Sequence, residues 1–140
     1  MYAAIDLAKY IVSKCIDDDC PINNQTLQKI LFYIQKNFLS REKYAFLDDI
    51  EAWGFGPAIP NVYYHYCGYG VMEIRYNHGN IIIPNEDKNV IDIIIEEKRQ
   101  LPFWETAKEI NRKGGAWDFV YNNGNGNRAV ISTDIIKLKG

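Results

Sequence analysis

The stretch "NNQTLQKILFYIQKNFLSR", residues 23–41, decides the fold more than any other part of the sequence. Asn23 and Asn24 both have side chains that cap the start of a helix well. Apolar side chains then recur with the period of about 3.6 residues that marks one face of a helix. This stripe consists of Leu27, Ile30, Leu31, Ile34 and Phe38. Phe32 and Tyr33 widen the stripe, which predicts a central helix that is buried on more than one side.

Apolar spacing predicts further helices before and after this central one. Residues 4–16 and 88–101 carry aliphatic side chains at helical spacing. Residues 102–113 begin with a proline, which the first turn of a helix accepts. A short aromatic helical segment should follow "GGAW", and Ser132 is a candidate cap for a last short helix. The chain therefore reads as predominantly helical.

The segment "IEAWGFGPAIPNVYYHYCGYG", residues 50–70, combines turn residues with many aromatic side chains. Residues 48–53 read as a short extended piece. Pro57 and Pro60 disfavour helix at the residues that precede them, although Pro60 can itself occupy a first helical turn. We therefore expect a bend followed by a helix over residues 60–67, which the glycines after it would end.

Two other stretches favour strands. "VMEIRYNHGNIIIP", residues 71–84, predicts a hairpin in which "EIRY" and "NIIIP" pair across "NHG", with Pro84 at an edge. "RAVI", residues 128–131, is a further strand candidate. The predicted fold class is mainly α (α+β). It is a compact single-domain helical bundle over residues 1–140, with about five to six helices and a small antiparallel β-hairpin or sheet.

Composition limits the class of function. The chain has 140 residues, 47% hydrophobic and 24% charged, which is typical of one globular domain. Its net charge of −2 makes nucleic acid an unlikely partner and disfavours a DNA-binding repressor. No apolar run approaches the ~20 residues of a membrane span, and the start does not read as a signal peptide. We expect a cytoplasmic protein with no membrane partner.

Metal binding is weighed on four donors, Cys15, Cys20, His65 and Cys67. Structural zinc sites prefer two tight pairs of ligands, and neither the spacing of Cys15 and Cys20 nor the His-x-Cys pair fits that pattern. An odd number of cysteines suits a reducing compartment. The run "DDD" at residues 17–19 reads as a solvated helix end. We expect no metal and no cofactor.

Catalytic motifs of the serine, zinc or phosphate-binding kind do not occur in the sequence. "NNGNGN" contains the pattern G-x-G without the strand, third glycine and helix that hold a phosphate. Glu51 and His65 are the best candidates for a small hydrolase or a nucleotide-handling enzyme, but no partner motif supports them. The sequence therefore favours a protein that is not an enzyme.

A binding role has more support, because tyrosine and tryptophan are enriched at protein interfaces. Tyr63, Tyr64, Tyr66 and Tyr69 follow one another closely, and a helix cannot bury all four. An aromatic core would give the same composition. We expect Tyr64, Tyr66 and Tyr69 to contact a protein partner.

Four segments occur in an order that matches a known pattern: residues 27–39, 50–63, 68–70 and 110–124. "LQKILFYIQ" and "EAWGFGPAIPNVY" carry the match, and the series resembles the Panacea domain family of phage-associated and SocA-like antitoxin proteins. The residues that we interpret as its structural signature are Leu27, Lys29, Tyr33, Trp53, Gly56, Pro57, Pro60, Tyr63 and Trp117. Asn111 stands where the family has a histidine, so any chemical role of that histidine would be absent.

The resemblance implies a non-catalytic antitoxin of a bacterial or prophage toxin–antitoxin module, which neutralises a protein toxin by direct binding. One member of the family delivers its toxin to a protease, so a host protease is a further partner to consider. The alternative within the binding class is a phage accessory protein that inhibits a host defence factor, such as an anti-CRISPR-type inhibitor.

Overall fold

The computed structural model of the chain describes residues 1–76, 79 and 81–140. Its elements are α1 (Ala4–Asp17), α2 (Asn24–Ser40), β1 (Glu51–Trp53), β2 (Gly56–Ala58), α3 (Pro60–Tyr66), the 3₁₀ turn η1 (Cys67–Tyr69), α4 (Asn85–Arg99), α5 (Phe103–Ile110), α6 (Ala116–Tyr121), the 3₁₀ turn η2 (Asn122–Gly124) and α7 (Thr133–Lys139). The described residues are thus mainly helical with one small antiparallel sheet, which confirms the predicted fold class. Seven α-helices lie within the described residues, one more than the upper expectation of six.

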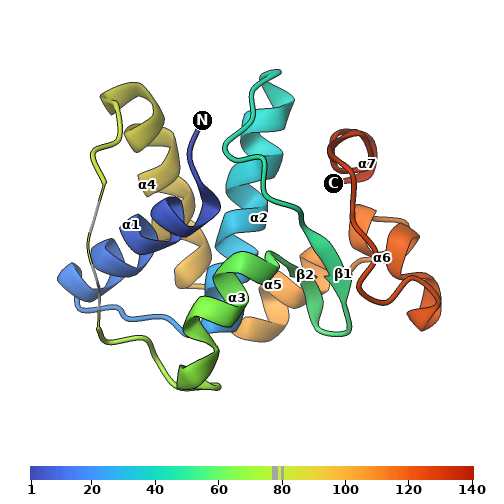
Figure 1. Cartoon of the computed structure of the whole chain (residues 1–140), viewed down its shortest axis with the longest axis horizontal. Helices are drawn as coiled ribbons and strands as arrows, with labels where there is room; N and C mark the ends of the chain where they lie inside the picture. Colours follow the sequence, from blue (N-terminus) through green and yellow to red (C-terminus); the bar gives the residue numbers. More distant parts are fainter. Residues whose placement is uncertain (77–78, 80) are drawn as a thin grey trace.

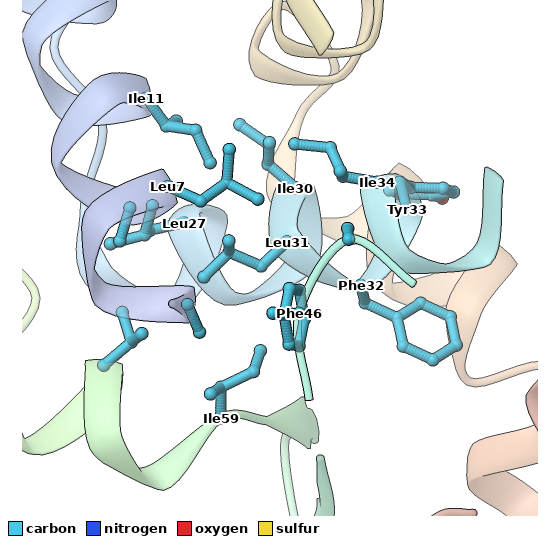
Figure 2. Packing of buried hydrophobic residues seen from close by; sticks show 14 of the residues in the cluster. Leu7, Ile11, Leu27, Ile30, Leu31, Phe32, Tyr33, Ile34, Phe46 and Ile59 are labelled. Atoms are coloured by element: carbon cyan, nitrogen blue, oxygen red, sulfur yellow. The ribbon is translucent and has the colours of Figure 1, made fainter. Parts of the chain in front are cut away.

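Helix α2 lies at the centre of the molecule, as its apolar stripe predicts. It contacts α1, α3, α4, α5, α7 and strand β2, and Figure 1 shows it running between the α1–α4 side and the sheet with α6 and α7. Leu7 and Ile11 of α1 face Ile30 and Leu31 of α2 in the core, and all four are fully or almost fully buried (Figure 2). Burial on several sides explains why α2 has no solvent-facing polar stripe over most of its length.

The start of α2 is fixed by side-chain amides. Asn23 caps the helix by accepting a hydrogen bond from the Thr26 N–H at 2.9 Å. Buried Gln28 accepts from the Ile59 N–H at 2.8 Å and donates to Asn24 Oδ1 at 3.0 Å. Asn24 in turn donates to a main-chain carbonyl of α3 at 3.0 Å. These bonds attach the bend between β2 and α3 to the central helix.

A second buried amide of α2 holds the chain that returns from it. Gln35 accepts a hydrogen bond from the Ala45 N–H at 2.8 Å and donates to the Phe46 carbonyl at 2.7 Å. Both Ala45 and Phe46 are fully buried, so this irregular segment has its main-chain polar groups satisfied by one side chain. The amides of α2 therefore replace the hydrogen bonds that a regular element would supply.

Tyrosine–carboxylate hydrogen bonds attach the outer helix α4 to α1 and its N-terminal extension, and α5 to α2. They run from Tyr2 to Asp87 (2.7 Å), from Tyr10 to Asp92 (2.5 Å) and from Tyr33 to Glu109 (2.7 Å). Burial and the neighbouring carboxylate both raise the pKa of each of these tyrosines. The phenols therefore stay protonated donors at neutral pH.

The hairpin predicted over residues 71–84 is wrong in its described part. Residues 71–76, 79 and 81–84 form no strand, and the remaining three positions, which include His78, lie outside the described residues. Ile74 and Ile83 are each buried in the main core, and the Ile74 N–H donates to the Ile22 carbonyl at 2.8 Å. The isoleucines thus pack against other elements rather than pairing with each other. The antiparallel pair is β1–β2, with Glu51 opposite Ala58.

The strand candidate "RAVI" runs beside β1 and is correct only in part. Val130 forms an isolated antiparallel bridge with Glu51, and the Ile131 N–H donates to the Ile50 carbonyl at 2.7 Å. The last helix begins as expected, because Ser132 accepts a hydrogen bond from the Ile135 N–H. These contacts bring the C-terminal segment against the edge of the small sheet.

Candidate partner-binding surface

The turn between β1 and β2 places aromatic rings at the surface. Trp53 ends β1, Phe55 lies at the tip, and Gly56 begins β2 with a φ of +138°. A Cβ at Gly56 would lie 3.1 Å from Asn111 Oδ1, and L side chains rarely adopt this φ. The glycine therefore allows the chain to turn tightly directly after Phe55.

Four rings from this turn and from α3 pack together. The Trp53 ring lies 4.9 Å from that of Tyr63, 6.0 Å from that of Phe55 and 5.8 Å from that of Tyr64, measured between centroids. Together with Arg128 they line most of a shallow pocket of about 340 Å³. We call Trp53, Phe55, Tyr63, Tyr64 and Arg128 the aromatic face. Within this face Trp53 is buried, whereas Tyr64 is 54% exposed.

Arg128 is exposed but is held in one position on the aromatic face. Its guanidinium lies 4.3 Å from the centre of the Trp53 ring, and Nη1 donates to the Tyr64 hydroxyl at 3.0 Å. Its main chain has a φ of +67°, which is uncommon for a residue with a side chain. The N–H that this conformation presents donates to the Ala52 carbonyl at 2.6 Å. Arg128 thus offers a charged group whose rotamer is already ordered.

Two residues from the C-terminal half support the turn from beneath. Trp117 Nε1 donates to the Trp53 carbonyl at 2.7 Å, and its ring stacks on Tyr121 with 4.6 Å between centroids. Asn111 Nδ2 donates to the Phe55 carbonyl at 3.2 Å. The amide that replaces the expected family histidine therefore has a structural contact here: it holds the tip of the hairpin.

Lys29 lies beside the aromatic face and is almost completely buried, with 2% of its surface exposed. Its Nζ has no hydrogen-bond partner among the described residues. The nearest rings are those of Phe103, 4.8 Å from Nζ, and Phe55, at 5.6 Å. Burial lowers the pKa of Lys29 from its ordinary 10.5 to about 8. A charged side chain is thus buried here without a hydrogen-bond partner among the described residues.

The three tyrosines predicted as contacts have different environments. Tyr64 is exposed in the aromatic face, and Tyr69 is half-buried, with its ring 6.5 Å from that of Tyr66. Tyr66 is only 2% exposed. The expectation that Tyr66 is available at the surface is wrong, because it shares with Val62 the side of α3 that packs into the core. Within the predicted set, Tyr64 is therefore the best candidate for a contact.

The remaining signature residues have structural positions. Leu27 is fully buried in the core, and Pro57 is buried in β2. Pro60 is at the start of α3, where its missing N–H costs nothing. Tyr33 is the donor to Glu109 described above. These residues shape the domain around the surface rather than forming the surface itself.

The candidate catalytic residues make contacts with aromatic groups. Glu51 accepts a hydrogen bond from Trp53 Nε1 at 2.8 Å, and His65 packs edge-on against Tyr66 at 4.7 Å. The cysteines are unpaired: Cys15 is buried and Cys67 exposed. Within the part of the chain that the structure describes, no group of three or more Cys, His, Asp and Glu side chains is placed to hold a metal ion. None of the helices in this part is long and apolar enough to cross a membrane.

Sequence reasoning did not identify Phe55, Phe103 or Arg128 as surface residues. Arg128 lies in a turn rich in asparagine and glycine, 64 positions from its partner Tyr64, so no local pattern connects the two. The burial of Lys29 has one sequence signal: Phe32 and Tyr33, three and four positions later, lie on the same side of the helix and widen its apolar stripe there.

The fold and the surface together define a small helical domain that presents tyrosine, phenylalanine and arginine, the residue types that dominate protein interfaces. The family described as "Antitoxin SocA-like, Panacea domain" matches residues 27–118, more than half of the chain, and the protein belongs to this family. This confirms the resemblance found in the sequence. Antitoxin SocA of Caulobacter vibrioides (strain NA1000 / CB15N) is 25% identical over 129 residues, which cover 83% of this chain and 69% of that protein. No solved structure matches.

Proposed function

We propose that this protein is a cytoplasmic antitoxin that neutralises a protein toxin by binding it directly, and that the aromatic face is the contact surface. Membership of an antitoxin family supports the antitoxin role and makes catalysis an unnecessary assumption. The observation that carries the choice of surface is the ordered cluster of Tyr64 and Arg128 on Trp53.

Preorganisation of its side chains favours binding at the aromatic face. Tyrosine, tryptophan and arginine supply most of the energy at the centre of protein interfaces. A side chain that is already fixed loses little conformational entropy on binding, and Arg128 is fixed by both its stacking and its hydrogen bond. The neighbouring Gly54 and Asn127 are exposed, so a partner can approach the rings without moving a large side chain.

Co-expression with the adjacent reading frame tests this proposal. The neighbouring gene should be toxic when expressed alone and tolerated when this chain is present. The double variant Tyr64→Ala/Arg128→Ala should lose rescue and co-purification with the toxin. Tyr44→Ala is the matched control, because Tyr44 is 47% exposed and lies outside the aromatic face; this variant should rescue normally.

Each outcome has a distinct meaning. Failure of every neighbouring gene product to be toxic or to bind this chain would contradict the antitoxin role. Rescue by a correctly folded double variant would move the contact away from the aromatic face. Toxin that disappears from cells only when this chain and a host protease are both present would identify delivery to a protease, whereas stable but inactive toxin would identify sequestration.

A further inference from the structure

Lys29 is the one charged residue in the buried part of α2, and its surroundings differ from those of every polar neighbour on that helix. Asn24, Gln28 and Gln35 are equally buried, and each makes hydrogen bonds with the main chain or with another amide. Lys29 Nζ makes none within the described residues. Among the described residues, Nζ instead lies over the rings of Phe55 and Phe103.

A buried ammonium without a hydrogen-bonded partner destabilises the folded protein, because it has lost its water and gained no equivalent contact. Methionine would fill a similar volume at this position without that penalty. Attraction to two ring faces compensates only in part, since such interactions are weak compared with the hydration of a charge. Packing alone therefore does not explain a lysine here.

The two rings that lie over Lys29 Nζ belong to partly exposed residues. Phe103, whose ring contacts Nζ, is 46% exposed, and Phe55 is half-buried. Phe55 belongs to the hairpin tip, and Phe103 is the first residue of α5. The two rings thus come from different elements and are both partly exposed, and Phe55 belongs to the surface that we propose binds the toxin.

We infer that Lys29 receives a carboxylate of the partner: an aspartate or glutamate side chain of the toxin that inserts between the rings of Phe55 and Phe103. This inference rests on the proposed function and names the chemistry of its contact. A single ammonium balances the single negative charge of a carboxylate, whereas a phosphate monoester carries about −1.5 to −2 at neutral pH. The apolar rings would exclude water from the pair and so strengthen it. Asn111 Oδ1, the other orphan atom beside the Phe55–Gly56 turn, is an acceptor and offers nothing to an anion.

The test is a mutant cycle on the complex with the toxin identified by co-expression. Lys29→Met in this chain should weaken the toxin's Kd by about 30-fold or more, as expected for a charge pair removed from water. Lys36→Met is the matched control on the same helix, because Lys36 is half-buried and its pKa is also lowered by burial. It should change Kd by less than about threefold. Each aspartate and glutamate of the toxin is then replaced by asparagine or glutamine.

One acidic substitution in the toxin should weaken binding to the wild-type chain and have no further effect on Lys29→Met. Lysine side-chain NMR of the wild-type complex gives a second readout that does not depend on a variant: the pKa of Lys29 should rise when the toxin binds. Unchanged affinity of Lys29→Met, no coupled acidic residue, or coupling only to the chain terminus of the toxin would overturn the inference. If Tyr64→Ala/Arg128→Ala lost binding while Lys29→Met kept it, the proposed function would hold and the Lys29 contact would be wrong. If no toxin were found, both proposals would be wrong.

Discussion

Two sets of polar side chains on α2 behave in opposite ways. The amides of Asn24, Gln28 and Gln35 are buried and hydrogen-bonded, and each holds another segment of the chain in place. Lys29 follows Gln28 directly and is equally buried, but its Nζ makes no hydrogen bond to any residue that the structure describes. Adjacent positions on one helix thus separate polar groups that stabilise the fold from a polar group that destabilises it.

The difference shows how a small core can carry polar residues for two purposes. A buried amide with both ends paired contributes stability and specifies where loops dock. A buried charge without a hydrogen-bonded partner lowers stability, and the partner carboxylate proposed above would account for its presence. We therefore expect apolar substitution of a paired amide to lower the free energy of unfolding, and apolar substitution of Lys29 to raise it.

The largest effect is expected for Gln28→Ala. This change leaves the Ile59 N–H and Asn24 Oδ1 unpaired in the core, and we expect a loss of about 3 to 4 kcal/mol in the free energy of unfolding. Urea unfolding followed by circular dichroism measures it. Gln25→Ala, on the same helix at a partly exposed position, should cost less than about 1 kcal/mol. Equal losses of stability for the two variants would contradict the view that the hydrogen bonds of Gln28 stabilise the fold.

Lys29→Met should change stability in the opposite direction. Removing a buried, unpaired ammonium is expected to raise the free energy of unfolding at pH 7 by about 2 to 3 kcal/mol, from a pKa that burial lowers to about 8. The same urea experiment gives the value. A destabilised Lys29→Met would mean that the amine has a stabilising contact after all, and would contradict the contrast with the amides.

The pH dependence of stability gives a second test of whether the buried ammonium of Lys29 destabilises the folded chain. The pKa of Lys29 is about 8 in the folded chain and 10.5 in the ordinary, unfolded state. Between these values the unfolded state binds more protons, so the contribution of Lys29 becomes more favourable as pH rises. The stability gap between Lys29→Met and wild type should therefore narrow by about 2 kcal/mol from pH 7 to pH 10. A stability difference that stays constant with pH would show that the pKa of Lys29 is not lowered in the folded chain.

The smallest effect is expected for Asn111→Ala, because one polar atom of its amide is hydrogen-bonded and the other is not. Its Nδ2 is bonded to the Phe55 carbonyl, whereas Oδ1 is buried without a partner. Losing one bond and removing one orphan acceptor should nearly cancel, for a change of about 1 kcal/mol or less. Thermal unfolding of Asn111→Ala and Gln28→Ala under the same conditions compares their losses of stability. A loss as large as that of Gln28→Ala would show that the hairpin tip depends on the Asn111 amide.

Features with a local cause could be predicted from the sequence. The period of α2 and the caps at Asn23 and Ser132 are properties of neighbouring residues, and all three are found in the structure. The hairpin over residues 71–84 failed because isoleucines favour strands in isolation, whereas Ile74 and Ile83 are each buried against other elements.

The candidate surface was harder to predict, since its parts come from distant positions. Tyr64 was identified from composition, but its contact with Arg128 depends on the turn after α6. Tyr66 was misplaced because the side of α3 that faces the core is set by packing against α1. The match of Lys29 to a family pattern indicated a structural residue, and only the three-dimensional arrangement shows that its Nζ has no hydrogen-bond partner within the described part of the chain.

The amide contacts of α2 also have a consequence for the order of folding. A glutamine can hold the chain at residues 45–46 or 59 only after its own helix has placed it, so these irregular segments cannot dock before α2 exists. Helix α2 is local in sequence and should form part of the folding nucleus, while the sheet and α3 consolidate later. Kinetic analysis should therefore give φ-values near 1 for core substitutions such as Leu31→Ala and near 0 for Val62→Ala. The central helix would then act as the template on which the rest of the domain condenses.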